Sequence, residues 1–431
     1  MKKPECLSPA GSIKNMMYAL AYGADAVYAG QPRYSLRVRN NEFTLEKLAE
    51  ARQITQAMQR KLYVVNNIAP HNSKLTTFVK DLAPVAALNP DAMIMSDPGV
   101  IMLTREHYPY LPVHLSVQAN TVNWASVKFW QQLGVKRIIL SRELGLAEIE
   151  EIRQRCPDIE LEVFVHGALC MAYSGRCLLS GYINKRDANQ GACTNACRWQ
   201  YKAAPATENE VGQFVPTLGE GPSTEQAFLL QEPQRPDELM PAFEDEHGTY
   251  IMNSRDLRAV EHVHKLVEIG VDSLKIEGRT KSFYYCARTA QVYRSAIDAA
   301  VNGEPFDPDL SLQLDHLANR GYTEGFLNRH KHDAYQQYDR GDSVSSSRQL
   351  VGEVLSKANG GLLIDVKNRF KAGDTLELMT PEGNHFVQVE SLTTDSGEAI
   401  SVAKGSGHKV ILPLSLNVNP EYAILTRVIP E

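Results

Sequence analysis

The sequence predicts an α/β protein: a TIM-like (β/α)8 barrel with a long insertion after its seventh strand, followed by a small β-rich C-terminal domain. Over residues 1–305 of the 431, eight apolar runs alternate with helical patterns, which is typical of parallel strands joined by crossover helices. Eight similar units favour a closed barrel over an open doubly wound sheet. From residue 341 onward, short apolar runs separated by turn residues replace this alternation and indicate antiparallel β structure.

The predicted barrel strands are short apolar segments, and the chain between most of them has room for one helix. Helical patterns at residues 44–58 and 146–155 are two of these helices, and helices at 256–268 and 281–301 are expected on either side of the last strand. The eight predicted strands are Pro4–Leu7, Asp25–Ala29, Leu62–Val65, Ala92–Met95, Val113–Val117, Arg137–Leu140, Leu161–Val165 and Ser273–Ile276.

The alternation breaks after Val165, where a cysteine-rich insertion at residues 167–249 is predicted. Its second part, residues 203–248, contains six prolines and ten acidic residues against one basic residue, Arg235. This composition is typical of a surface segment rather than of core. After the barrel we expect a helical connector at 306–340.

The C-terminal domain, residues 341–431, is predicted to be a small antiparallel β-barrel or sandwich. Turn pairs such as Asn359-Gly360 and Glu382-Gly383 separate its expected strands. Its apolar runs lie at residues 350–355, 361–366, 375–379, 386–389, 410–412 and 422–426.

Polar residues alternate with apolar ones inside several predicted barrel strands. Glu162, Phe164 and His166 share one face of their strand, and Lys275 and Glu277 share one face of another. The apolar faces can pack on the helices while these faces point into the barrel. A buried Glu and Lys would be costly unless paired. One interpretation is an internal ion pair with bound water. The other is a site at the barrel mouth, where the C-terminal ends of strands carry chemistry.

Four of the seven cysteines lie within one glycine-studded segment, with the spacing C-x6-C-x15-C-x3-C. Structural zinc sites favour two tight pairs, and only the last pair here is tight. Iron–sulfur clusters are held by four thiolates with varied spacing. Four unrelated buried thiols are the third interpretation. The candidate metal ligands are Cys170, Cys177, Cys193 and Cys197.

Three arginine-bearing segments follow predicted strands: QPRYSLRVRNNEF, SREL and KIEGRTKS. Arginines that converge at a barrel mouth suit carboxylate or phosphate recognition, because the guanidinium fork binds either group through two hydrogen bonds. For any single arginine, a solvated surface residue is the alternative. The candidate substrate-binding residues at strand ends are Tyr28, Arg37, Arg39, Asn67, Gln118, Arg142, Lys275 and Arg279.

Composition and missing motifs exclude several classes of protein. Hydrophobic residues make up 43% and charged residues 22% of the chain, which is an ordinary globular balance. No apolar run has the roughly 18 residues of a membrane span, and the N-terminus lacks a secretory signal, so we expect a cytoplasmic protein without membrane contact. The net charge of −6 restricts nucleic-acid binding to a local basic patch. The HExxH, G-x-S-x-G and G-x-G-x-x-G motifs are absent.

The segment EVFVHGALCMAYSGRCLLS, residues 162–180, resembles the signature of the peptidase U32 family. The resemblance extends through LSPAG, ADAVYAG, LSVQAN and SLKIEGR and covers essentially the whole chain. The segments RYSLRVRNNEF, SGYINKRD, CTNACRW and KIEGRTKSFYYCARTAQVYR are similar to the branch that hydroxylates tRNA wobble uridines with prephenate. This resemblance implies a 4Fe–4S cluster, prephenate as hydroxyl source, and the tRNA anticodon loop as the partner that receives 5-hydroxyuridine.

The resemblance assigns Cys170, Cys177 and Cys193 to the cluster. Some relatives have a further cysteine where this chain has Arg258, and Cys197 is the natural replacement because it lies close to Cys193. Beside these ligands, the inward polar residues of the last two barrel strands give the candidate catalytic residues, Glu162, His166 and Glu277.

Two other functions remain open at this point. The family label suggests a peptidase, although the sequence offers no compelling nucleophile. A binding or assembly protein with a structural zinc would explain the cysteines without catalysis. Metal analysis separates the iron–sulfur enzyme from the zinc protein.

Overall fold

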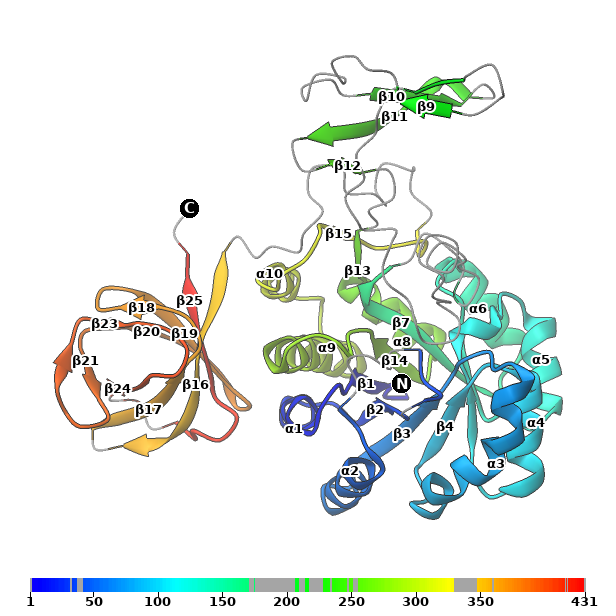
Figure 1. Ribbon diagram of the computed structural model, residues 1–431, viewed down its shortest axis with the longest axis horizontal. Helices are drawn as coiled ribbons and strands as arrows, with labels where there is room; N and C mark the ends of the chain where they lie inside the picture. Colours follow the sequence, from blue (N-terminus) through cyan, green and yellow to red (C-terminus); the bar gives the residue numbers. More distant parts are fainter. Residues whose placement is uncertain are drawn as a thin grey trace.

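Eight parallel strands close into a barrel in the computed structural model, as the sequence predicts (Figure 1). The strands pair in chain order, and the ring closes because β14 pairs with both β1 and β7. The structure describes residues 2–31, 33–36, 42–169, 174, 206–208, 214–216, 228–232, 235–245, 248–250, 255–328, 347–358, 360–414, 416 and 418–429. The barrel strands are β1 (Glu5–Pro9), β2 (Ala26–Gly30), β3 (Lys61–Asn66), β4 (Ala92–Met95), β5 (Val113–Leu115), β6 (Arg137–Ile139), β7 (Glu160–Ala168) and β14 (Ser273–Ile276).

Helices cover the outside of the barrel, and several begin at the residue types that favour helix starts. Ser12, Thr44, Asp97 and Ser282 each accept a hydrogen bond from a backbone amide of the first turn. None of the described helices is long and apolar enough to cross a membrane. The helices are α1 (Ile13–Ala21), α2 (Leu45–Ala57), α3 (Asn72–Ala87), α4 (Pro98–His107), α5 (Trp124–Gln132), α6 (Leu146–Arg155), α8 (Val263–Ile269), α9 (Phe283–Asn302) and α10 (Asp309–Asp315).

The barrel interior contains a buried group of ion pairs, which we call the lumen cluster: Glu5, Arg137, Glu162 and Lys275. The guanidinium Nη1 of Arg137 lies 2.7 Å from Glu5 Oε1 and 3.0 Å from Glu162 Oε2. Lys275 Nζ lies 2.7 Å from Glu162 Oε1. Burial alone would raise the pKa of Glu5, but the neighbouring Arg137 holds it below its ordinary value. The internal ion pair, one of the two interpretations of the inward-facing Glu162 and Lys275, is therefore present. The lumen cluster contains two carboxylates and two cationic groups.

We expect the substitution Arg137→Ala to destabilise the fold by about 3–5 kcal/mol, because it removes the guanidinium that bridges the buried carboxylates of Glu5 and Glu162. The free energy of unfolding, measured in urea at pH 7, tests this. Arg155→Ala removes an exposed ion pair with Glu151 and should change it by less than about 0.5 kcal/mol. Because the pKa of Glu5 is lowered in the fold, its contribution is present at neutral pH and lost as the pH falls below about 4.5. Equal effects of the two substitutions would contradict a stabilising role for the lumen cluster.

One predicted helix is partly wrong, because residues 256–258 form a strand rather than the start of a helix. Strand β13 (Asp256–Arg258) pairs antiparallel with the end of β7, and β15 (Tyr322–Thr323) pairs with β13. The helix α8 begins only at Val263, after a turn of 3-10 helix at Val260–His262. Pairing with β7 decides the local structure here, and the sequence pattern does not reveal it. The predicted helical connector correspondingly contains both α10 and β15.

Within the insertion the structure describes five further strands, which pair as two small antiparallel groups outside the barrel (Figure 1). Strands β8 and β9 pair with each other, and β10, β11 and β12 form the second group. Their bounds are β8 (Ala206–Glu208), β9 (Phe214–Pro216), β10 (Phe228–Glu232), β11 (Arg235–Asp245) and β12 (Gly248–Tyr250).

The C-terminal domain is antiparallel, as predicted, with the strand order β20-β19-β25-β16-β17-β24-β21-β22. Val351, Ile364, Leu378 and Leu425 are among the residues of its own buried core. The strands are β16 (Arg348–Ala358), β17 (Gly361–Val366), β18 (Phe370–Lys371), β19 (Thr375–Thr380), β20 (Gly383–Gln388), β21 (Leu392–Thr394), β22 (Ala399–Ile400), β23 (Val402–Ala403), β24 (Lys409–Pro413) and β25 (Ile424–Val428).

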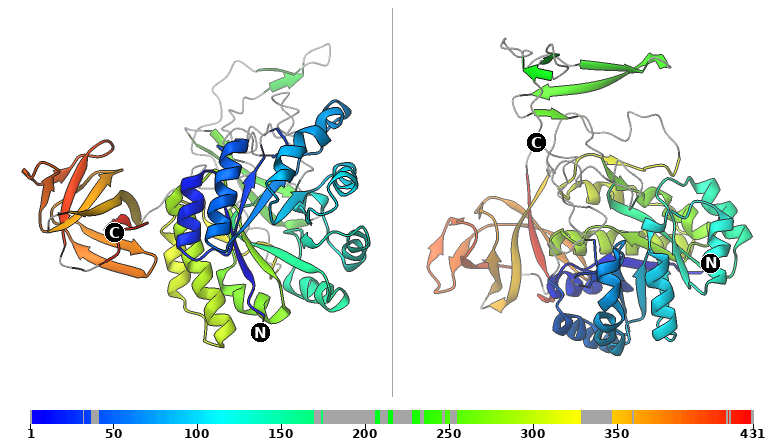
Figure 2. Two further views of the ribbon diagram at one scale, coloured as in Figure 1. Left: turned by 90° about the horizontal axis from the view of Figure 1, so that it is seen from below. Right: turned by 45° about the vertical axis from the view of Figure 1, so that its right-hand side comes forward.

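This domain packs against α1 and α9 of the barrel (Figure 2). Arg288 on α9 forms a fully buried ion pair with Glu377 on β19, at 2.6 Å. Met379 and Ile424 of the C-terminal domain belong to the same apolar cluster as the barrel core. The contact therefore covers an apolar side of the barrel and fixes the domain to it.

Candidate active site

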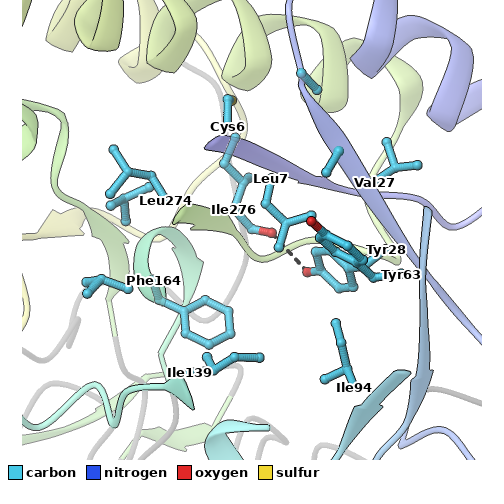
Figure 3. Packing of buried hydrophobic residues seen from close by; sticks show 14 of the residues in the cluster. Cys6, Leu7, Val27, Tyr28, Tyr63, Ile94, Ile139, Phe164, Leu274 and Ile276 are labelled. Atoms are coloured by element: carbon cyan, nitrogen blue, oxygen red, sulfur yellow. Dashed lines mark hydrogen bonds between the residues drawn. The ribbon is translucent and has the colours of Figure 1, made fainter. Parts of the chain in front are cut away.

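The C-terminal ends of the barrel strands bring four of the predicted residues together at the mouth: Tyr28, Arg142, Glu277 and Arg279. The ring of Tyr28 lies inside the barrel, and its hydroxyl donates to the carbonyl oxygen of Ile276 at 2.9 Å (Figure 3). The same hydroxyl lies 3.5 Å from Glu277 Oε2. Burial, and then the nearby Glu277, raise the pKa of Tyr28 well above its ordinary value. Tyr28 is therefore a neutral phenol that can donate a hydrogen bond.

Arg142 follows β6 and stacks on an aromatic ring of the barrel interior. Its guanidinium carbon lies 3.9 Å from the ring centre of Phe164, and Arg142 Nη2 lies 3.6 Å from Glu277 Oε2. The side chains of Arg142 and Glu277 are 14% and 20% exposed, so solvent still reaches this pair. Stacking on the ring fixes the plane of the guanidinium, which suits recognition of a planar anion.

Arg279 follows β14 and is buried beside Tyr28, with its guanidinium carbon 5.8 Å from the centre of that ring. Its Nη1 donates to Ser35 Oγ at 2.6 Å. Gly30, the last residue of β2, makes room for this contact. A Cβ atom at Gly30 would lie 2.6 Å from Arg279 Nη1 and 2.7 Å from Ser35 Oγ. Position 30 therefore favours glycine because any side chain would clash with Arg279 and Ser35.

Sequence reasoning missed Ser35 and the residue that anchors its loop, Asp81. Asp81 Oδ2 accepts hydrogen bonds from Tyr34 at 2.6 Å and from Arg33 at 2.7 Å. Arg33 has a φ of 73°, which non-glycine residues rarely adopt. These contacts hold the start of the loop that carries Ser35. Arg37 and Arg39, which come next in the chain, lie outside the described residues.

Two amide side chains, Asn67 after β3 and Gln118 after β5, form a hydrogen-bonded pair next to the loop that carries Ser35. Asn67 Nδ2 donates to Gln118 Oε1 at 3.1 Å, and Asn67 Oδ1 accepts from the backbone amide of Leu36 at 3.2 Å. Close by, Asn120 donates to the backbone carbonyl oxygen of Ser174 at 2.8 Å. Ser174 lies between Cys170 and Cys177 in the chain, and the hydrogen bond places Ser174 itself beside Asn120.

Two further predicted site residues, Glu162 and Lys275, belong to the lumen cluster, and Lys275 Nζ also lies 4.4 Å from the centre of the Tyr28 ring. The prediction that His166 faces into the barrel is wrong, because the register between β7 and β14 shifts beside it. Lys275 pairs with Phe164, but the next residue, Ile276, pairs with His166. This β-bulge turns the imidazole away from the barrel interior, against three tyrosines, Tyr285, Tyr293 and Tyr322.

The environment of His166 keeps its imidazole neutral. Burial lowers the pKa of His166 to about 3. Its Nδ1 lies 3.3 Å from the hydroxyl of Tyr293, which itself donates to the carbonyl oxygen of Val165 at 2.7 Å. The histidine is thus integrated into the packing between β7 and α9.

Cys170, Cys177, Cys193 and Cys197 all lie outside the described residues. The three described cysteines, Cys6, Cys156 and Cys286, are buried and have free thiols. Burial raises the pKa of Cys6 and of Cys286 to about 12, which makes them poor thiolate donors. In the described part of the chain, no group of three or more His, Cys, Asp or Glu residues could hold a metal ion. By their chemistry, four thiols within one short segment of the sequence are a suitable donor set for an iron–sulfur cluster.

A family model for peptidase family U32 matches residues 11–337, and one for the C-terminal domain of that family matches residues 346–427. The chain belongs to peptidase family U32. The two matches meet near the boundary between barrel and C-terminal domain. The U32 family assignment rests on more than half of the chain.

Several U32 relatives are similar over nearly their full length. The chain is 62% identical to tRNA hydroxylation protein P of Escherichia coli over 99% of this chain and 97% of the relative. It is 61% identical to tRNA hydroxylation protein P of Haemophilus influenzae, over 99% of this chain and 96% of that relative. It is 34% identical to tRNA hydroxylation protein P1 of Bacillus subtilis, over 94% of this chain and 90% of that relative.

Proposed function

We propose that this chain is a tRNA hydroxylase that forms 5-hydroxyuridine at the wobble position, with prephenate as hydroxyl source and a 4Fe–4S cluster as cofactor. The observation that carries the proposal is the near full-length similarity, at 62% identity, to a tRNA hydroxylation protein. The geometry of the mouth supports it, because two arginines, a phenol and a carboxylate surround one position at the strand ends.

The mouth residues divide naturally between the two substrates. Prephenate carries two carboxylates, and Arg142 and Arg279 supply the guanidinium groups to bind them. The amides of Asn67 and Gln118 match the donor and acceptor groups on the edge of a uracil ring. The Glu277 carboxylate can accept a proton, and the Tyr28 hydroxyl, 3.5 Å away, can help to orient it. The uridine must leave its stack to reach this depth, which an anticodon loop allows at low cost.

The cysteine segment is proposed to hold the cluster through Cys170, Cys177, Cys193 and Cys197. When bound, a cluster of this kind supplies one-electron redox chemistry. The hydrogen bond from Asn120 to Ser174 supports a location beside the mouth. Some relatives have a cysteine at the position of Arg258, but here the Arg258 guanidinium pairs with Asp315 at 2.6 Å. Position 258 therefore offers no thiol, which supports Cys197 as the fourth ligand.

The geometry does not favour a peptidase. At the described part of the mouth, Ser35 accepts from Arg279, and no serine or cysteine there forms a hydrogen bond with a histidine. An activated nucleophile of the Ser–His or Cys–His type is therefore missing from these residues. A zinc-binding assembly protein is the other alternative, and metal analysis distinguishes it from the iron–sulfur enzyme.

The test is mass spectrometry of nucleosides from tRNA of cells that lack this protein. We expect 5-hydroxyuridine and nucleosides derived from it to disappear, and to return when the wild-type gene is supplied. Incubation of the unmodified tRNA with purified protein and prephenate should then restore the nucleoside. An unchanged nucleoside profile in the deletion strain would refute the proposed function.

A further inference from the structure

The basic residues of the C-terminal domain gather in one part of it. Residues 347–429 contain eight Lys and Arg residues against nine Asp and Glu residues, so the domain as a whole is not basic. Five of the eight lie in residues 366–373 and 401–410, and these two segments contain no acidic residue. We call the two segments the basic patch. Its cations are Lys367, Arg369, Lys371, Lys404 and Lys409.

The two segments of the basic patch lie side by side, because strands β18 and β23 pair (Figure 1). Phe370 lies opposite Ala403, and the same antiparallel register brings Arg369 opposite Lys404. Phe370 and Ala403 are buried in the core of the domain. Because successive side chains of a strand point to opposite faces, those of Arg369 and Lys404 project outward, and both residues are exposed.

Arg369 and Lys404 have no partner in the part of the chain that the structure describes: neither side chain forms an ion pair or a hydrogen bond there. By contrast, Arg348 and Arg427 of the same domain pair with carboxylates. Like charges on facing strands repel each other, and a polyanion across them would relieve that repulsion. The backbone amides of residues 405–407, next to Lys404, donate to no described acceptor. A guanidinium, an ammonium and backbone N–H groups are the donors that bind phosphate oxygens.

Contacts between the two domains connect the basic patch to the mouth of the barrel. Lys367 Nζ lies 3.6 Å from Glu353 Oε2, and the same carboxylate pairs with Lys14 in the first turn of α1. That turn follows the C-terminal end of β1, so it lies at the mouth end of the barrel. The neighbouring Asn15 donates to the carbonyl oxygen of Lys281, which follows β14, at 2.8 Å. The basic patch therefore begins beside the mouth and extends away from it over the C-terminal domain.

We propose that the basic patch binds the phosphate backbone of a double-stranded RNA stem whose loop is held at the barrel mouth. An RNA helix carries its phosphates away from the loop, so a protein that holds the loop meets stem phosphates on an adjoining surface. Arg369 and Lys404 supply contacts that do not depend on the base sequence. The presence of a tRNA loop at the mouth rests on the proposed function, whereas phosphate binding by the patch does not.

Fluorescence anisotropy of the full-length protein with a labelled RNA hairpin, a tRNA anticodon stem-loop, tests this inference. We expect the double variant Arg369→Gln/Lys404→Gln to bind the hairpin at least about tenfold more weakly than wild type in about 0.1 M salt. The slope of log Kd against log salt concentration should fall by about two, because each lost phosphate contact lowers it by about one.

The double variant Arg105→Gln/Lys136→Gln is the matched control. It also removes one exposed arginine and one exposed lysine, but from the end of the barrel opposite the mouth, near the end of α4 and directly before β6. It should bind the hairpin as wild type does. Thermal melting of each variant checks that it is folded.

Two results would overturn the role of the basic patch. One is wild-type affinity and salt dependence in the Arg369→Gln/Lys404→Gln variant, and patch-dependent binding to phosphatidylserine vesicles in that case would indicate a membrane surface instead. The other is an equal loss in the control, which would reveal only an effect of net charge. Nucleoside analysis separates the two proposals. Weaker hairpin binding by the patch variant with unchanged nucleosides in the deletion strain refutes the tRNA hydroxylase alone, whereas loss of 5-hydroxyuridine in that strain with an unaffected patch variant refutes the patch alone.

Discussion

Replacing Cys193 by alanine is expected to remove the iron and all tRNA hydroxylation. The proposed cluster would be held by four thiolates, and loss of the Cys193 thiolate should weaken its hold on the iron. Anaerobically purified wild type should contain about four irons per chain and absorb broadly near roughly 400 nm, whereas the Cys193→Ala protein should contain almost none. Iron analysis, the visible spectrum and the tRNA assay measure the three consequences together.

Cys286→Ala is the matched control for this experiment. Cys286 is fully buried on α9, and burial raises the pKa of its thiol to about 12. The substitution removes one sulfur from the core and should cost about 1 kcal/mol of stability without loss of iron. Stoichiometric zinc without iron in the wild type would contradict the cluster. So would full iron content in the Cys193→Ala protein.

Replacing Arg279 by lysine is expected to lower kcat/KM for prephenate in the proposed reaction by about 10- to 150-fold. The charge is kept, but an ammonium on a flexible stem cannot hold Ser35 and present a second donor to a carboxylate in one plane. A lost charged hydrogen bond is worth about 1.5–3 kcal/mol, which gives a loss of this size. Initial rates of 5-hydroxyuridine formation at varied prephenate concentration provide the measurement.

Arg105→Lys is the control for this substitution. Arg105 donates to the backbone carbonyl oxygen of Gly134 at 2.9 Å, on the outer helices of the barrel. Its replacement should leave kcat/KM within about twofold, because surface substitutions have small effects. If Arg279→Lys also retained wild-type kinetics, Arg279 would have no two-donor role in binding.

Strand alternation was sufficient to predict which side chains point into the barrel only where the strands are regular. Lys275 and Phe164 face inward as expected, and the lumen cluster realises the ion pair that a buried Glu and Lys require. His166 does not follow, because a single extra residue in β7 reverses the face of everything after it. Nothing in a residue pattern of period two marks where such a bulge occurs.

The mouth residues that lie in a barrel strand or directly after one could be predicted from the sequence, whereas those on longer loops could not. Tyr28 lies in β2, Arg142 and Arg279 follow β6 and β14 within a few residues, and the parallel barrel brings the three together. Ser35 depends on a loop that Asp81, some 46 residues later, holds by two hydrogen bonds. Such a contact between distant segments has no local signal in the sequence. The same reason explains β13, whose partner β7 lies across the whole insertion.

The pairing of Ala168 with Asp256 also has a consequence for how this architecture can vary. The chain leaves the barrel at the end of β7 and returns to it at β13, and these two strands pair, so the two ends of the insertion lie side by side. Each doubling of the length of a flexible loop between two such fixed ends costs only about 0.6 kcal/mol of closure entropy. Insertions of very different length between β7 and β13 should therefore leave the lumen cluster and the eight barrel strands unchanged.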